Sequence, residues 1–442
     1  MMTLIASIGV LLIRQQVTQV QPKFTPAPLP QDIKLGDDLV VVKVTAAEAG
    51  HIAMEKSPKL RLARALLAGA HGNTISAQSG LLPQVSVNAS RNEVDVVRGG
   101  SSNSGNSNGG GGYTASLSVS QLIFDFGHQL ALTRQAIANE KAAFHGLSRA
   151  EQDVIFLTKA AFYTFTLDAT LVTVQEANVK DRQAQLALAQ ARVDAGPGEP
   201  SDLITAKTNL AEATQQLVQA RSTAMSARIA LALGMGIDPR TPIAAAESDE
   251  PKSNSDFTAY YKRALDFRPD LLQSIQQLRA AGFEVQAART NDVPVIGLTA
   301  GFTSNGKNDP TTNQTLSASL SVNWALFDGF NSHGKRLSAQ ADLETARATL
   351  ASLQLTIGSD VATAWSVLQF AEQRLPIAQS EETLATESLR IATGRYRAGI
   401  GSFLGVTDSE ASLVTAQQSA ASAKTAVSTA WAALRHAIGD PN

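Results

Sequence analysis

The feature that most constrains this 442-residue chain is a strand pattern of period two that occurs twice. In Thr315–Phe330 apolar residues alternate with small polar ones, which places all the apolar side chains on one face of a strand. Tyr113–Gly127 repeats the pattern. The alternating part of each run, Leu316–Trp324 and Tyr113–Ser120, is close to the roughly ten residues with which a tilted strand crosses a bilayer. One copy alone would favour a half-buried strand of a soluble sheet, so the duplication decides the interpretation.

The repeat extends well beyond these strands. The numbering of the matched segments differs by 294 − 83 = 211 before the strands and by 399 − 196 = 203 near the ends of the long helical runs. The sequence therefore predicts two copies of one unit: helix, strand, loop, strand, very long helix, tight turn, helix. The matched segments are Leu82–Val85 with Val293–Ile296, Ala191–Gly196 with Gly394–Gly399, and Leu233-Gly234 with Ile438-Gly439.

This pattern divides the chain into four parts, which are residues 1–44, a repeat over 45–234, a connector over 235–256 and a second repeat over 257–442. In the first part, Leu4–Ile13 has the length of a signal-peptide core but lacks a preceding basic residue, so a degraded signal peptide and a plain tail both remain open. Gln21–Pro30 carries four prolines and is predicted to be a stiff linker.

Composition excludes several classes of function. Lys and Arg total 37 against 39 for Asp and Glu, so no net charge favours nucleic acid. Cysteine is absent, which excludes disulfides, thiolate metal sites and a cysteine nucleophile. The six histidines lack metal-ligand spacing, and no nucleophile-elbow, Walker or dinucleotide motif occurs. We therefore expect a protein without enzymatic activity, metal or cofactor. No run of eighteen apolar residues occurs, so no transmembrane helix is predicted.

The helical segments are unusually long. Thr45–Gly80 is predicted to be helical, with a second helix starting at Ser57-Pro58. His128–Ala195 and Asn331–Ala398 would each extend roughly 100 Å at 1.5 Å per residue. Pro376 is expected to kink or break the second of them. Such lengths favour coiled-coil or barrel-stave packing.

Two further segments complete a set of four strands. Gln84–Val97 and Val295–Ser304 alternate in the same way, and the Gly/Ser/Asn-rich Gly99–Gly112 lacks the lysine of a phosphate-binding loop, so it is expected to be a hairpin loop. A sheet in lipid must close, and about eight strands are the minimum for a barrel, so four cannot close alone. Three chains would supply 3 × 4 = 12 strands and enclose a water-filled conduit.

With these features in place, the chain resembles the TolC family of outer-membrane efflux proteins from about Val44 to Gly439. The resemblance implies a homotrimer with a twelve-stranded β-barrel in outer-membrane lipid and a helical α-barrel crossing the periplasm. It further implies passive export, powered by an inner-membrane pump through a periplasmic adaptor protein. The motifs that carry it are the strand–helix corners at Phe124-Asp125 and Phe327-Asp328 and the helix ends Arg192–Gly196 and Arg395–Gly399.

The resemblance also suggests gate residues at the periplasmic ends of the helices. Asp408 corresponds to an acidic ring at the constriction, although the family's second acid is Gly405 here. The alternative is a solvated acid in the first turn of a helix. Ser201 and Asp202 match residues that close the channel together with Tyr396, but either could instead be a helix N-cap after Pro200.

Other family positions differ here or carry structural alternatives. A basic residue of the family is replaced by Gly401, leaving Arg395 and Arg397 as substitutes, yet both also suit a helix C-terminus. Gly196 and Gly399 are expected to be left-handed caps whatever the function. The helix ends that would dock the adaptor contain Gly196, Pro197, Gly399 and Gly401.

The sequence leaves several functions open. An export duct for small molecules leads, and the same duct could serve type I protein secretion or metal efflux. A trimeric coiled-coil scaffold or surface adhesin without transport is the alternative from another class.

Overall fold

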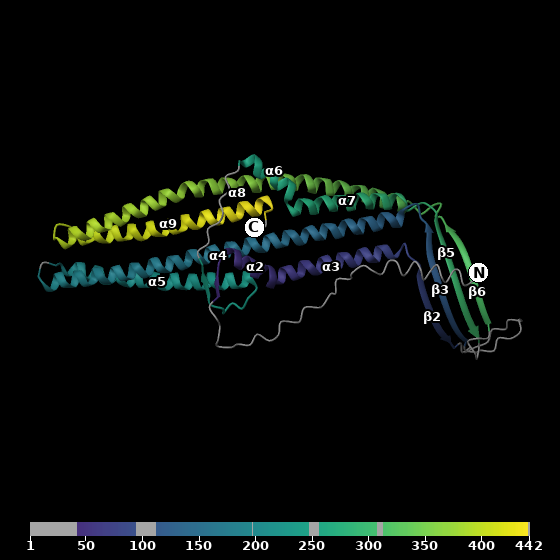
Figure 1. Ribbon diagram of the computed structural model, residues 1–442, viewed down its shortest axis with the longest axis horizontal. Coiled ribbons are helices and arrows are strands. Elements are labelled where there is room, and N and C mark those ends of the chain that lie inside the picture. The colour runs from purple at the N-terminus through teal and green to yellow at the C-terminus, as the bar shows by residue number, and fades with distance from the viewer. Residues whose placement is uncertain (1–41, 94–111, 197, 247–255, 307–312, 441–442) are drawn as a thin grey trace. The chain divides into compact units, whose positions relative to one another are not determined.

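The computed structural model describes residues 42–93, 112–196, 198–246, 256–306 and 313–440, which are mainly helical (Figure 1). The helices are α2 Ala46–Lys56, α3 Pro58–Ser79, α4 His128–Asp194, α5 Pro200–Met235, α6 Phe257–Phe267, α7 Pro269–Arg289, α8 Asn331–Arg397 and α9 Phe403–Ile438. The strands are β1 Val42–Val44, β2 Gln84–Asn92, β3 Gly112–Phe124, β4 Ile243–Ala245, β5 Val295–Gly306 and β6 Asn313–Asn323.

The two halves repeat each other element by element. The starts of α2 and α6 are offset by 257 − 46 = 211, and the same offset separates α3 from α7 (269 − 58) and β2 from β5 (295 − 84). The starts of α4 and α8 are offset by 331 − 128 = 203. These two helices are both 67 residues long, and α5 and α9 are both 36 residues long. The drop in the offset shows that the second copy is shorter between the start of its first sheet strand and the start of its long helix.

The final helix of each copy ends on a left-handed glycine. Gly236 has a φ of 70° and Gly439 a φ of 77°, and their numbers differ by the same 439 − 236 = 203. The expected match between Gly234 and Gly439 is wrong by two positions, because Gly234 lies inside α5. A Cβ on Gly236 would also lie 2.9 Å from the carbonyl oxygen of Lys56, so this position requires glycine for its space as well.

Local signals explain the helix boundaries. The Thr45 side chain accepts a bond from the Glu48 amide while Glu48 bonds back to Thr45, which forms a capping box at the start of α2. Pro58 begins α3, as predicted, and Pro269 begins α7 in the same way. Pro376 lies inside one continuous α8, so the expected break does not occur.

The four long strands form one antiparallel sheet in the order β2-β3-β5-β6. Its register aligns the apolar residues into rows across the sheet and the polar residues into rows on the opposite face, as the alternation predicts. One apolar row is Val87, Leu117, Phe302 and Leu316. One polar row is Ser86, Ser118, Gly301 and Ser317. β2 and β6 are the edges, and within the described residues neither pairs with a further strand.

A second, two-stranded sheet was missed in the sequence. β1 pairs in parallel with β4, joining Val42 to Ile243 and Val44 to Ala245. The sequence also allows a short strand over Leu39–Val44; its first three residues lie outside the described part, and β1 is the remainder. β4 lies in a segment interpreted only as a connector. Its three residues are too few for a periodic pattern to show.

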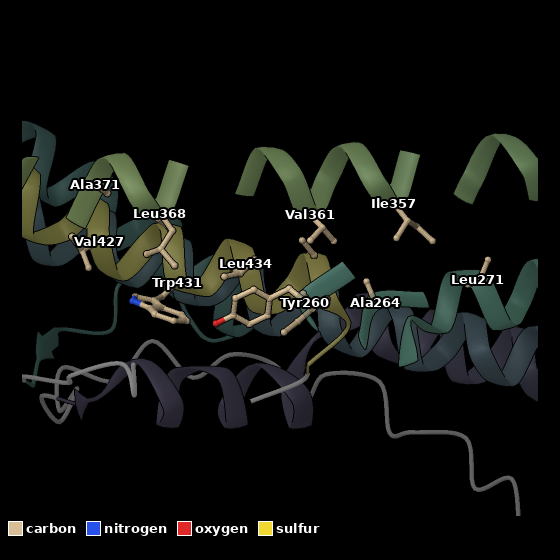
Figure 2. Close-up of a cluster of buried hydrophobic side chains, with 13 residues drawn as sticks. Tyr260, Ala264, Leu271, Ile357, Val361, Leu368, Ala371, Val427, Trp431 and Leu434 are labelled. Carbon is tan, nitrogen blue, oxygen red and sulfur yellow. The ribbon is translucent and has the colours of Figure 1, made fainter. Parts of the chain in front are cut away.

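Each copy builds its main core where the short helices pack against the long ones. In the second copy, α6, α7, α8 and α9 contribute a cluster that includes Tyr260, Val361 and Trp431 (Figure 2). The first copy has an equivalent cluster around Phe162 and Leu231, which also contacts Ala432 of α9. Burial of these side chains fixes the long helices at mid-length, while their ends pack through smaller clusters.

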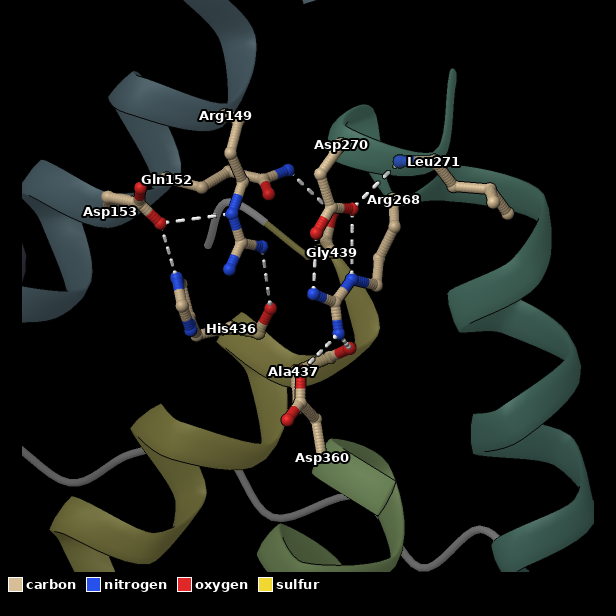
Figure 3. Close-up of polar contacts among 10 residues, drawn as sticks. All are labelled: Arg149, Gln152, Asp153, Arg268, Asp270, Leu271, Asp360, His436, Ala437 and Gly439. Atoms are coloured by element: carbon tan, nitrogen blue, oxygen red, sulfur yellow. Dashed lines mark hydrogen bonds and ion pairs between the residues drawn. The ribbon is translucent and has the colours of Figure 1, made fainter. Parts of the chain in front are cut away.

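A charged network ties the two copies together beside this core (Figure 3). The buried Arg268 guanidinium donates to Asp270 at 2.6 Å, to Asp360 at 3.0 Å and to the carbonyl of Ala437 at 3.3 Å. Asp153 on α4 meets His436 on α9 at 2.7 Å. The end of the second copy is thereby bound both to its own helices and to α4 of the first copy.

One described helix could cross a membrane by length and composition alone. An 18-residue window of α4 has a mean hydropathy of 1.2, and 33% of that window is buried within the chain. No transmembrane helix was predicted from the sequence, but the length and composition of α4 alone would allow one. α4 packs along its length against α3, α5, α7 and α9, as a core helix of the chain does.

We predict that Asp270→Asn destabilises the protein at neutral pH by about 3 kcal/mol, because it leaves the Arg268 charge buried with one partner fewer. Burial alone would raise the pKa of Asp270, but bonds from Arg268 hold it below the ordinary value. This stabilisation is present above the ordinary pKa of aspartate and is lost as pH falls through the lowered pKa. Thermal unfolding between pH 7 and pH 3 should show less acid sensitivity in the variant.

The exposed Asp266 provides the control for this measurement. Asp266→Asn should leave both the melting temperature and its pH dependence close to those of the unmodified protein. Equal melting curves for the two variants would contradict the stabilising role of the Arg268–Asp270 pair.

Candidate functional site

The two long helical hairpins each end in a turn of five residues, here called the tip turns, at 195–199 and 398–402. Gly196 has a φ of 95° and Gly399 a φ of 76°, the left-handed conformation expected of both. The amide of Gly399 donates to the carbonyl of Tyr396, and that of Ile400 to Arg395. These bonds satisfy carbonyls that the helix end leaves free. Pro197, the fourth residue expected to dock an adaptor, lies outside the described residues.

Each tip turn contains a second glycine, of which Gly401 but not Gly198 was singled out in the sequence. A Cβ on Gly198 would lie 2.5 Å from the amide nitrogen of Val193, and a Cβ on Gly401 would lie 3.0 Å from that of Tyr396. Gly198 and Gly401 show the same repeat offset as the two left-handed glycines (401 − 198 and 399 − 196), so the repeat could have identified Gly198. At Gly401, interpreted as the loss of a basic residue, a side chain would therefore press on the backbone of the helix end.

Tyr396 connects the two hairpins just above the tip turns. Its side chain is 3% exposed, and its hydroxyl donates to a carboxylate oxygen of Asp202 at 3.2 Å. The guanidinium of Arg192 lies 4.4 Å from the ring centroid and donates to the Tyr396 carbonyl at 2.7 Å. Phe403 packs against the same ring, with 5.4 Å between centroids. One side chain of α8 therefore contacts α4, α5 and α9.

The environment of Tyr396 keeps its hydroxyl protonated. Burial, followed by the neighbouring carboxylate of Asp202, raises the pKa of Tyr396 above its ordinary value. The hydroxyl consequently remains a hydrogen-bond donor to Asp202 throughout the physiological range. Arg192 was noted only as part of a motif, and its contact with an aromatic ring on a distant helix left no local signal.

The alternative role as a helix N-cap, considered for Ser201 and for Asp202, is wrong for both. Glu199 is the N-cap residue of α5 and Pro200 is its first residue, so Ser201 and Asp202 lie within the first turn. The Ser201 hydroxyl donates to Glu199 at 3.2 Å. The structure therefore joins Asp202 to Tyr396 by a hydrogen bond, whereas the Ser201 hydroxyl bonds within its own turn.

Asp408 and Arg397 are both exposed. Asp408 is the sixth residue of α9, in its second turn, which contradicts the alternative of a first-turn acid. Ser402 caps this helix instead, accepting from the Gly405 amide at 3.2 Å. Within the part of the chain that the structure describes, neither the Asp408 carboxylate nor the Arg397 guanidinium forms an ion pair.

The strand–helix corners lie at the opposite ends of α4 and α8. Phe124 ends β3, and Asp125 accepts bonds from the amides of Gly127 at 3.0 Å and Gln129 at 2.6 Å. Asp328 accepts from the amide of Ser332 at 2.7 Å, and the neighbouring Phe327 is exposed. Each aspartate thus binds free amides at the start of a 67-residue helix.

The described residues contain no group of three or more His, Asp or Glu side chains that could hold a metal ion. The arrangement at the tip turns consists of hydrogen bonds, a cation–aromatic contact and close backbone turns. These contacts can hold the ends of the two hairpins together.

These features agree with the comparisons to known proteins. The chain matches the outer membrane efflux protein family over residues 50–236 and 260–440, and it belongs to that family. The protein is accordingly an outer-membrane efflux component located in the outer membrane. Members of this class are channel proteins rather than enzymes.

Two curated relatives share sequence with the chain. Protein CyaE of Bordetella pertussis is 26% identical over 334 residues, covering 74% of this chain and 68% of that protein. Outer membrane efflux protein BepC of Brucella suis is 27% identical over 243 residues, covering 53% of this chain and 52% of that protein. The chain thus spans about half the length of BepC.

Solved structures share the fold at lower identity. The Campylobacter jejuni CmeC outer membrane channel superposes with a TM-score of 0.81 at 17% identity, over 90% of this chain and 86% of that one. The outer membrane protein VceC of Vibrio cholerae superposes with a TM-score of 0.77 at 22% identity, over 89% and 96% of the two chains. The mainly helical fold is therefore that of outer-membrane channels.

We predict that Gly198→Ala destabilises the protein by about 1–3 kcal/mol, because the new methyl group would overlap the backbone of Val193. Gly394→Ala is the matched control, since a Cβ there meets nothing within 4 Å and alanine favours a helix by about 1 kcal/mol. Thermal unfolding should show a lower midpoint for the first variant and an equal or higher one for the second. If Gly198→Ala unfolds at the same temperature as the unmodified protein, the close contact between residue 198 and the Val193 backbone is refuted.

Proposed function

We propose that three copies of this chain form a passive export duct through the outer membrane. The observation that supports this most strongly is the open sheet: β2 and β6 expose unpaired edges, one face is apolar and the other carries Ser, Thr, Asn and Gly. In lipid, those edges must pair with other strands. Pairing β2 of one copy with β6 of the next closes a ring, and three copies give a twelve-stranded barrel with the polar face lining water.

The long helices carry a second surface suited to another copy. Four large apolar side chains recur every seven residues on α8 and are 48–69% exposed. A similar row follows α5, with Ala211 completing the period. A seven-residue repeat produces left-handed supercoiling of paired helices. The α8 stripe is Phe370, Ile377, Leu384 and Ile391, and the α5 stripe is Ile204, Ala211, Val218 and Met225.

The two stripes belong to different hairpins, so the α8 stripe of one copy can pack on the α5 stripe of the next. This head-to-tail contact closes into a ring of helices continuous with the ring of strands. In this arrangement residues 45–234 and 257–442 are two repeats that together form one chain's share of the barrel, and residues 235–256 connect them. The long helices form the α-barrel below the membrane.

We assign the gate to the tip turns. Asp202 and Tyr396 hold the two hairpins of one copy together, with Ser201 and Arg397 beside them. Asp408 would form a ring of three carboxylates around the threefold axis, which repel one another and attract cations. The tip turns, with Gly196, Pro197, Gly399 and Gly401, would receive a periplasmic adaptor protein linked to an inner-membrane pump that supplies the energy.

We predict that Leu384→Glu weakens or abolishes the trimer, because it places a charge in the apolar contact between copies. Thr386→Glu is the control, since it adds the same charge about 200° around the helix. The molar mass of the detergent-solubilised protein by light scattering should fall toward one chain only for the first variant. Trimers that persist equally in both would argue against the α8–α5 contact.

The duct itself is tested by conductance of the purified protein in planar bilayers. We expect stepwise conductance, and Asp408→Ala should change the single-channel conductance or relieve block by divalent cations, because the carboxylate ring is removed. Conductance and block identical to the unmodified protein would refute the role of Asp408. A protein that extracts into buffer without detergent and does not conduct would instead support the scaffold or adhesin.

A further inference from the structure

A row of buried polar side chains lies between the two hairpins, above the tip turns. Its four members on α4 are spaced three, four and three residues apart, so they share one face of the helix. The facing member, Glu410 on α9, is 1% exposed. We call this row the polar seam. Its residues are Gln175, Asn178, Arg182, Gln185 and Glu410, and all are buried.

The members of the polar seam bond mainly to one another. Gln185 donates to a carboxylate oxygen of Glu410 at 2.9 Å and accepts from the guanidinium of Arg182 at 3.3 Å. Asn178 donates to Gln175 at 3.2 Å, while its own carbonyl oxygen is buried without a hydrogen-bond partner. A seam that leaves one buried acceptor unsatisfied is weaker than an apolar contact of the same area.

Glu410 occupies a position that the rest of α9 fills with apolar residues. The buried face of this helix runs through Phe403, Val406, Glu410 and Leu413, the three–four spacing of a coiled-coil core. A carboxylate at such a position costs free energy unless it is paired or protonated. On the buried face of α9 this cost falls at one position, Glu410, which lies between the hairpins.

Separation of the hairpins would return Glu410 to water. Glu410 lies seven residues beyond the start of α9, about 10 Å along the helix from Phe403, which packs on Tyr396. The polar seam and the Asp202–Tyr396 contact therefore hold the same two hairpins at neighbouring heights. Any opening at the tip turns that moves α9 away from α4 must also open the polar seam.

We propose that opening of the polar seam is coupled to release of a proton from Glu410. The carboxyl group binds its proton more tightly while it is buried between the hairpins than when they separate and water reaches it. This inference rests on the proposed gate at the tip turns, and it adds a proton as the ligand that favours the closed state.

The charges around Glu410 fit this assignment. Burial, and then the carboxylate of Asp181, raise the pKa of Glu410, while Arg182 and the bond from Gln185 offset part of that effect. On α5, Glu212 competes for the Arg182 charge. On α8, the hydroxyl of Ser388 lies 3.4 Å from that of Ser409 on α9. The nearby Glu387 and Arg390 on α8 are exposed and pair with each other.

The sign follows from linkage. A carboxyl group whose pKa is raised in the closed state binds its proton more tightly there than in the open state. Lower pH therefore favours the closed seam, and higher pH favours opening, between the ordinary pKa of glutamate and the raised one. Each unit by which the two pKa values differ changes the opening equilibrium by up to about tenfold.

The test uses the absence of cysteine from the chain. Ala189 is fully buried one turn beyond Gln185 on α4, so a cysteine there reacts with a thiol reagent only when the hairpins separate. The labelling rate of Ala189→Cys is measured from pH 5 to pH 8, with and without Glu410→Gln. The quantity compared is the labelling rate of the protein with Glu410 divided by that of the Glu410→Gln protein. Because the thiol chemistry is common to both proteins, this ratio reports the contribution of Glu410.

We expect this ratio to rise with pH, by up to about tenfold for each unit of pKa difference, because glutamine imitates the protonated group at every pH. Glu381→Gln on the exposed face of α8 is the control and should give a pH dependence equal to that of the protein with both glutamates intact. A flat ratio would overturn the proposal.

Conductance distinguishes this inference from the function on which it rests. If the protein conducts, its open probability should rise with pH in the unmodified protein and stay at the low-pH level in Glu410→Gln. Conductance with a flat labelling ratio refutes the role of Glu410 alone. A rising ratio without any conductance supports the proton-linked seam and refutes the duct.

Discussion

The structure depends on one constraint: backbone amides and carbonyls at a sheet edge cannot be left unpaired in lipid. A single chain offers four strands in the order β2-β3-β5-β6, with two free edges. The apolar rows make one face compatible with lipid, and the Ser- and Thr-rich rows make the other compatible with water. Such a sheet is an incomplete barrel wall, and in the duct that we propose further copies of the chain complete it.

Duplication supplies the geometry, and divergence between the copies supplies the contacts that matter at the tip turns. The backbone repeats at one constant offset from the start of each long helix to the end of each final helix. The residues that join the two hairpins do not repeat. Tyr396 corresponds to Val193, Asp202 to Gly405, Gln185 to Ser388 and Glu410 to Lys207. The two copies therefore share one backbone, but the side chains that join them near the tip turns differ between the copies.

Much of this fold could be predicted because its patterns are long. Alternation through Tyr113–Ser120 and Val295–Ser304 predicted the faces of β3 and β5, and the scarcity of helix breakers after each corner predicted two helices of equal length. Pro376 shows where a local rule fails: α8 continues through it, held by packing against α9 on either side. β4 was missed because three residues carry no period, and its partner β1 lies before the first copy, far away in the sequence.

The candidate site was less predictable, because burial and distant contacts decide it. Asp202 and Tyr396 were paired only through the family resemblance, while Arg192 completes their contact from a third helix. Glu410 was overlooked although it lies on the three–four spacing of Phe403, Val406 and Leu413. A charged residue in a core position is a signal that sequence reasoning could have used.

The most direct test of this account is a cross-link between the two sheet edges. One cysteine is placed in β2 and one in β6 of the cysteine-free chain. Within one chain these strands are separated by two others, about 14 Å, which is too far for a disulfide. Oxidation in outer membranes should produce covalent dimers and then trimers that grow no further. A protein that stays monomeric under oxidation at every register of the two edges would contradict the shared barrel.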